Sequence, residues 1–164
     1  MAHLLLPGVI LLPFVAALFV ALLPRRVPWL IEVVSLIAVA GDLAAAIALF
    51  PLEASLRAPW AGFGIEIALR ADALARFVVL GTAFFGVALL LYSAVFMHDR
   101  PRRKQFFLYA LLSLAMTQGA ALAQNLVLML FCWEGLLVTL FGMIAIGGRQ
   151  AWRTAIKALV IVGI

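Results

Sequence analysis

The chain has 164 residues, of which 68% are hydrophobic and only 12% are charged, with a formal net charge of +5. A soluble domain is about half apolar and about a quarter charged, so this composition excludes one and indicates an integral membrane protein. The basic residues lie between apolar runs and form no stripe with aromatic residues, which argues against nucleic-acid binding, and the single cysteine excludes an internal disulfide or a multi-cysteine metal site.

Five apolar runs are long enough to cross a bilayer, because a span needs about 20 residues at a rise of about 1.5 Å each. In chain order they cover residues 4–23, 29–50, 73–97, 106–122 and 126–146. The first lacks the basic start and cleavage site of a signal peptide, so we expect a retained helix. A sixth run begins near Thr154 and reaches only Ile164. The sequence therefore predicts an all-α polytopic membrane protein, with five full spans and a partial sixth in a single membrane domain, residues 1–164. We expect it to be the N-terminal fragment of a larger subunit.

Residues 60–72 do not read as a span. Apolar side chains alternate with small or charged ones from Phe63 to Arg70, and this period of two predicts a short strand or hairpin. Pro51 and Pro59 punctuate the connection before it. Asp72 follows as an N-terminal carboxylate of the third helix, where it suits the helix dipole.

Basic residues are concentrated in alternate loops, after the first, third and fifth runs. The positive-inside rule makes these loops cytoplasmic, which places the N-terminus and the β element outside. We expect a prokaryotic-type plasma (inner) membrane location and no nucleic-acid partner. Glu32 is expected to be an interfacial charge near the cytoplasmic start of the second helix.

Glu134 lies within the apolar stretch LMLFCWEGLLVTL, nine residues after Asn125 and therefore about 13 Å along a helix. A carboxyl at that depth costs about 2.5–3.5 kcal/mol on insertion scales, so such residues usually mark ion pathways. A structural, permanently protonated acid is the alternative. Counting back from a turn at residues 123–125 places Glu134 level with Leu114, with Ser113 and Thr117 as possible hydroxyl partners.

Two further charged residues lie inside predicted spans. Lys157 is about one turn into the sixth helix and level with Met143, which leaves about 13 Å of depth to Glu134 and excludes a direct ion pair. It either belongs, with Glu134, to a line of polar residues along which protons move, or extends its amine to the membrane interface. Asp42 lies in the middle of the second helix, where it faces a protein neighbour or a water cavity, and it is a possible polar partner in proton movement. Gly135 and Gly142 form a small-residue seam that allows another helix to approach closely.

Other chemistry has no candidate residues. The sequence contains no glycine-rich phosphate loop, no CxxC motif and no histidine at membrane depth, since His3 and His98 are terminal and loop residues. We therefore expect no cofactor, no metal and no redox centre carried by the chain itself.

The stretch LAQNLVLMLFCWEG, residues 122–135, resembles the fifth-helix motif A-D-N-L-L-x-L-x-x-x-W-E of antiporter-like subunits. These subunits occur in respiratory complex I, membrane-bound hydrogenases and multi-subunit cation/proton antiporters. Gln124 stands where the family commonly has an acidic residue. LRADALARF, residues 69–77, resembles the segment that opens the family's third helix, and RTAIKALVIVGI, residues 153–164, resembles the opening of its sixth.

The resemblance implies that Glu134 is a proton-translocating carboxylate, and Lys157 matches a lysine common on the sixth helix. It also implies that the lysine partner of Glu134 lies on a later helix, in a unit of about fourteen helices built from two inverted repeats. The first hypothesis is therefore proton translocation within a redox-driven complex (NADH:quinone oxidoreductase or hydrogenase type) or an antiporter, with other membrane subunits as partners. A non-conducting structural subunit of such a complex is the second, and an unrelated small transporter or enzyme subunit is the third.

Overall fold

A computed structural model describes residues 2–24, 28–60, 66–98 and 100–163. Within these ranges the chain forms the helices and strands α1 (Ala2–Leu22), α2 (Pro28–Leu49), β1 (Ala54–Pro59), β2 (Glu66–Ala71), α3 (Ala73–Phe96), α4 (Arg103–Leu122), α5 (Leu126–Ala145) and α6 (Arg149–Gly163). Helices α1 to α5 are long and apolar enough to cross a membrane, whereas α6 has 15 residues. The predicted all-α polytopic fold, with five full spans and a partial sixth, is confirmed.

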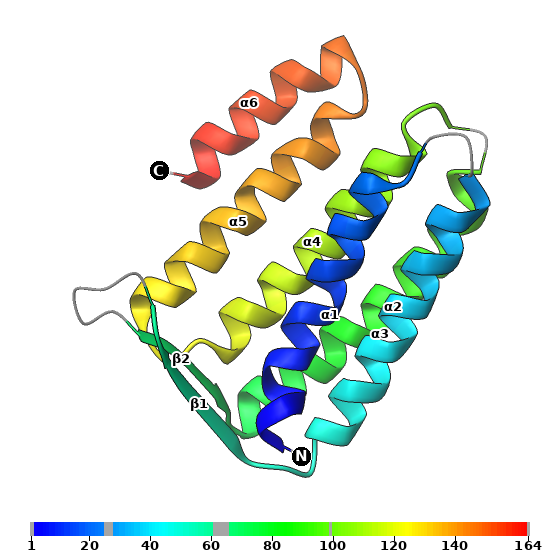
Figure 1. Cartoon of the computed structure of the whole chain (residues 1–164). Coiled ribbons are helices and arrows are strands. Elements are labelled where there is room, and N and C mark those ends of the chain that lie inside the picture. Colours follow the sequence, from blue (N-terminus) through cyan, green and yellow to red (C-terminus); the bar gives the residue numbers. More distant parts are fainter. Residues whose placement is uncertain (1, 25–27, 61–65, 99, 164) are drawn as a thin grey trace.

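Successive helices run in opposite directions, so the chain has two ends along the membrane normal (Figure 1). The N-terminus, the β-strands and the α4–α5 turn lie at one end, which we call the hairpin end. The α1–α2, α3–α4 and α5–α6 connections lie at the other, which we call the loop end. The basic segments around residues 100–104 and 149–153 therefore share one end, as predicted, while Arg25 and Arg26 lie outside the described residues.

The β element is an antiparallel hairpin, in which Ala54 pairs with Ala71 and Pro59 with Glu66. Of the predicted segment 60–72, residues 66–71 form β2 and residues 61–65 lie outside the described part of the chain. The interpretation of residues 54–59 as mere connection is wrong, because they form β1. Pro59 is tolerated there because it occupies the last position of a strand in a two-stranded sheet.

Two helix starts differ from the sequence prediction by three residues or more. Helix α4 begins at Arg103 instead of residue 106, and α6 begins at Arg149 instead of residue 154. Hydropathy alone placed the starts too late, because charged residues at the membrane interface are helical here while their side chains bind polar groups. Lys104, for example, donates hydrogen bonds to the carbonyls of Ala21 and Leu23, at 2.8 and 2.6 Å.

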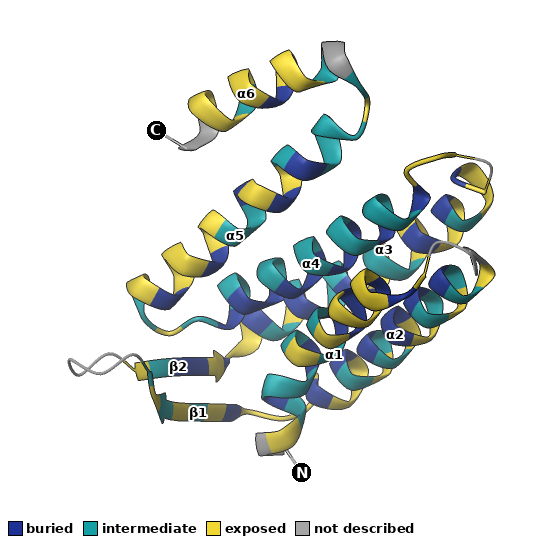
Figure 2. Cartoon of the chain, turned by 45° about the horizontal axis from the view of Figure 1, so that its top comes forward, coloured by how far each residue is buried: buried dark blue, intermediate teal, exposed yellow. Residues whose placement is uncertain are grey.

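Helix α4 is the centre of the bundle and packs against α1, α3 and α5. One apolar cluster near the hairpin end includes Leu6, Leu49 and Leu122, and a second towards the loop end includes Phe107 and Leu111. Figure 2 shows that α4 is mostly buried or half-buried, whereas α5 and α6 carry exposed residues on the sides turned away from α4. These exposed sides are where the candidate charges of α5 and α6 are found.

Candidate functional site

Glu134 lies on α5, eight residues after Leu126, and therefore about 12 Å from the hairpin end of that helix. Its side chain is exposed, and the residues one turn to either side, Leu130 and Val138, are exposed as well. The carboxyl is thus at bilayer depth on a flank of α5 that no other described element covers. A carboxylate in direct contact with lipid is costly, so this flank is suited to a protein partner.

The contact between Gly119 of α4 and Cys132 of α5 fixes the alignment of these antiparallel helices. A Cβ atom placed on Gly119 would lie 3.8 Å from Cys132 Cβ, so the two residues share one depth. Glu134, two residues further along, is then level with Thr117 and not with Leu114. The difference of three residues arises because the chain between α4 and α5 is extended and does not form the symmetric turn assumed in counting.

The glycine seam of α5 packs closely against another helix, as predicted, and that helix is α4. A Cβ atom on Gly135 would lie 2.6 Å from the sulfur of Met116, and one on Gly142 would lie 2.5 Å from the ring of Tyr109. At Gly142 the Tyr109 ring occupies the space that a Cβ atom would take, whereas at Gly135 the flexible Met116 side chain would have to shift. Successive residues of a helix are about 100° apart, so Glu134, next to Gly135, points to the side of this interface.

Ser113 and Thr117, the predicted hydroxyl partners, do not face Glu134. Their hydroxyls donate to carbonyls of their own helix, at 2.9 Å to Ala110 O and 2.7 Å to Ser113 O. Both side chains line a groove between α3 and α4, and Glu134 is not among the residues that line it. The predicted depth of Thr117 is correct to within a turn, but the facing is different.

Lys157 is exposed on α6, two residues after Ala155, which is fully buried. Two helical steps rotate a side chain by about 200°, so Lys157 points to the side of α6 opposite the buried one. The rings of Phe141 and Trp152 pack at 5.0 Å and hold α6 against the loop-end half of α5. Among the described residues, no ion pair joins Lys157 to Glu134.

Asp42 has a partner that the sequence analysis did not find. Gln118 of α4 donates a hydrogen bond from Nε2 to Asp42 Oδ2 of α2, at 2.7 Å, and both side chains are fully buried. The two residues are 76 positions apart in the sequence, and their hydrogen bond links α2 to α4. The pair could have been predicted from depth in the membrane. Gln118 is the one amide side chain of the predicted span 106–122, and both Gln118 and Asp42 lie nearer the hairpin end of their helices.

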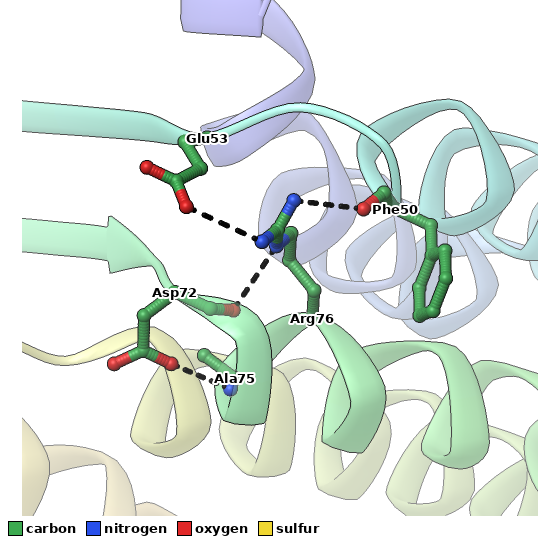
Figure 3. Close-up of polar contacts among 5 residues, drawn as sticks. All are labelled: Phe50, Glu53, Asp72, Ala75 and Arg76. Atoms are coloured by element: carbon green, nitrogen blue, oxygen red, sulfur yellow. Dashed lines mark hydrogen bonds and ion pairs between the residues drawn. The ribbon is translucent and has the colours of Figure 1, made fainter.

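At the hairpin end, the Arg76 side chain contacts three oxygen atoms (Figure 3). Its guanidinium donates to Phe50 O at 2.9 Å and to Asp72 O at 3.2 Å, and it lies 3.6 Å from Glu53 Oε1. The Asp72 side chain accepts from Ala75 N at 2.8 Å, which confirms its predicted place at the start of α3. These contacts join the end of α2 to the start of α3 beneath the hairpin.

At the loop end, Arg103 pairs with Glu32 of α2, and His98 Nδ1 lies 3.9 Å from the same carboxylate oxygen. Arg103 is buried, so the expectation that Glu32 is only an interfacial charge understates its role. Arg102 donates to Ile146 O, at 2.7 Å, beyond the last turn of α5. Arg102 thus binds the C-terminal end of α5, where the helix dipole favours a cation.

No family model and no curated protein matches the chain. Its fold is similar to that of a chain in the solved structure of the membrane-bound sulfane sulfur reductase, an archaeal respiratory membrane complex. The TM-score is 0.79 at 23% sequence identity, and the match covers 95% of this chain and 25% of the other. The chain thus spans about a quarter of the length of the chain that it matches. At this identity the likeness shows the fold, a multi-pass helical membrane domain.

Proposed function

We propose that the chain is the N-terminal portion of an antiporter-like subunit that translocates protons within a redox-driven membrane complex. The observation that carries the proposal is Glu134, a carboxyl at bilayer depth on a flank of α5 that is exposed in this chain. Its place in the Trp133–Glu134 motif supports the same function. The similar fold in a respiratory membrane complex is consistent with it, and that longer chain has room for further helices that could cover such a flank.

In this function, Glu134 holds a proton while its surroundings are apolar and releases it when a cation approaches. An opposite charge within about 4–6 Å favours the ionised form of a carboxyl, so movement of a lysine on a later helix would drive the release. Lys157 has a secondary role in the proposed proton transfer, because it lies on α6 and points away from the buried side of that helix. Electron transfer is assigned to other subunits.

The test is Glu134→Gln in the complete complex, purified through a tag on this chain and reconstituted in proteoliposomes. Proton uptake is followed with an entrapped pH-sensitive dye while the complex turns over its redox substrates. We expect uptake to be lost with the subunits still assembled, because glutamine keeps the shape and removes the titrating group. Glu66→Gln is the matched control, since Glu66 is an exposed carboxylate of the hairpin.

A non-conducting structural subunit is the competing function, and one observation favours it. Within the described residues, neither Ser113, Thr117 nor Lys157 makes a hydrogen bond to Glu134. If proton uptake by the assembled Glu134→Gln complex equals that of the unmodified one, proton relay by Glu134 is excluded. If the complex instead fails to assemble with glutamine and assembles with Glu66→Gln, the structural function is supported.

A further inference from the structure

The Asp42–Gln118 pair has two oxygen atoms without a hydrogen-bond partner. Gln118 Nε2 donates to Asp42 Oδ2 at 2.7 Å. Asp42 Oδ1 and Gln118 Oε1 are buried and have no hydrogen-bond partner among the described residues. Both atoms are acceptors when the aspartate is ionised, so this arrangement lacks a donor.

Among the described residues, no cation is placed to neutralise an ionised Asp42. Helix α2 packs against α1, α3 and α4, and the basic residues of these helices that the structure describes lie near their ends. Arg76 binds Phe50 O, eight residues or about 12 Å beyond Asp42 along α2. Arg103 and Lys104 lie at the opposite end of α4, about 21 Å from Gln118.

The other titratable groups of these elements are also remote or neutral. Glu32 lies ten residues before Asp42 on the same helix, about 15 Å away, and is paired with Arg103. Tyr109 lies about 13 Å along α4 from Gln118, and Tyr92 of α3 is 64% exposed. The hydrogen bond from Gln118 is thus the polar contact that the described residues offer to Asp42.

An ionised aspartate here would be a buried, unpaired charge inside a membrane bundle, which is among the costliest arrangements in a protein. A single proton removes that charge. It also provides the missing donor, because a neutral carboxylic acid carries one O–H group that a neighbouring amide oxygen can accept. The two unpartnered oxygens are the atoms that such a proton would serve.

We propose that Asp42 and Gln118 form a buried acid–amide pair that stores one proton within the bilayer, separately from Glu134. Gln118 and Glu134 lie at similar depths, since Gly119 is level with Cys132. The two candidate sites are on different sides of α4. Gln118 faces α2, whereas Gly119 faces α5, the helix that carries Glu134. The store gives the bundle a second protonation site on the far side of its central helix. Its place in transport rests on the proposed function, whereas its protonation does not.

Infrared difference spectroscopy tests the store directly, in the complete complex held in lipid nanodiscs at neutral pH. The spectrum of the unmodified complex minus that of Asp42→Asn should contain the C=O stretch of a protonated carboxylic acid. The band should remain in Glu134→Gln and move to higher frequency in Gln118→Leu, where the hydrogen bond is lost. If the difference spectrum shows the loss of a carboxylate and no protonated band, Asp42 is ionised and the proposal is overturned.

Two controls keep the result decisive. If Asp42→Asn fails to assemble, the frequency shift in Gln118→Leu identifies the band, and a spectrum without any shift overturns the proposal. A titration with sodium at constant pH separates a proton from a bound metal ion, because a cation site would lose the protonated band as sodium rises. Loss of proton uptake in Glu134→Gln with the Asp42 band intact would show that the two sites are separate.

Discussion

Gly119 of α4 and Cys132 of α5 are in direct contact near the hairpin end of the bundle. A Cβ atom on Gly119 would lie 2.8 Å from the cysteine sulfur, and Ile10 of α1 closes the space behind it at 3.9 Å. Both residues are buried, so a side chain at position 119 cannot turn to solvent. The contact explains why position 119 is a glycine, because a larger residue would overlap the sulfur of the buried Cys132.

The first prediction concerns this contact. Gly119→Ala should lower the free energy of unfolding by about 1–3 kcal/mol, the usual cost of overpacking a core. The double variant Gly119→Ala with Cys132→Ala should recover much of this loss, because removal of the sulfur makes room for the new methyl group. Thermal unfolding in nanodiscs measures the effect.

The control for the glycine is Gly81→Ala on α3. Among the described residues, no atom beyond its chain neighbours and its own helix backbone lies within 4 Å of a Cβ built there, so the substitution should cost nothing, and alanine favours a helix over glycine. A double variant as unstable as Gly119→Ala alone would contradict the packing explanation.

The second prediction compares two ion pairs. Glu32→Gln should destabilise the protein by about 3 kcal/mol, because it leaves Arg103, whose side chain is 7% exposed, without its counter-charge. Glu53→Gln should cost less than about 1 kcal/mol, since Glu53 is 84% exposed and 3.6 Å from Arg76. Equal melting temperatures for the two variants would show that the Arg103 pair contributes no more than a surface pair.

The third prediction concerns Asn125, which joins α5 to the hairpin. Its Oδ1 accepts from Leu128 N and its Nδ2 donates to Glu66 O, both at 2.7 Å. Asn125→Ala should cost about 2 kcal/mol by removing the cap and the hydrogen bond together. Asn125→Asp keeps the cap and loses the donor, so it should cost about half as much. Denaturation of the purified variants ranks them, and an aspartate variant that is no more stable than the alanine one would exclude a capping contribution.

The fourth prediction is the orientation in the membrane. Ser55 of β1 and Pro101 of the α3–α4 connection are exposed at opposite ends of the bundle, and replacing them leaves every charged residue in place. In intact cells, or spheroplasts if an outer membrane is present, with Cys132 replaced by alanine, Ser55→Cys should react with a membrane-impermeant thiol reagent. Pro101→Cys should react only after permeabilisation, because the basic loops are expected in the cytoplasm. The reverse pattern would place the N-terminus inside.

The sequence predicted the spans well because bilayer thickness fixes the length of an apolar helix. Helices α2, α3 and α5 begin or end within one residue of the predicted runs, and the small residues Gly135 and Gly142 pack closely against another helix as expected. The strand β1 was missed because Pro51 and Pro59 were interpreted as marking a connection, although Ser55 and Arg57 alternate with the apolar residues of 54–59. Its pairing depends on β2, which lies further along the chain.

The environment of the candidate residues was harder to predict than their depth. Counting residues placed Glu134 and Thr117 within a turn of each other, but it could not tell that the hydroxyl faces α3 while the carboxyl lies on an open flank. The hydrogen bond between Asp42 and Gln118 depends on how α2 is rotated about its axis relative to α4. That rotation is set by side-chain packing throughout the bundle, which no single helix encodes.

The hydrogen bonds of Lys104 to the end of α1 can form only late in the synthesis of the chain. The carbonyls that it binds, those of Ala21 and Leu23, belong to the end of the first helix and precede it by 83 and 81 residues. The ribosome has therefore made two further spans before this lysine exists. Until then the end of α1 must exchange hydrogen bonds with water at the interface, as free helix ends do. The end of α1 therefore gains these two hydrogen bonds only after α2 and α3 have been made, and a nascent chain that stops short of residue 104 lacks them.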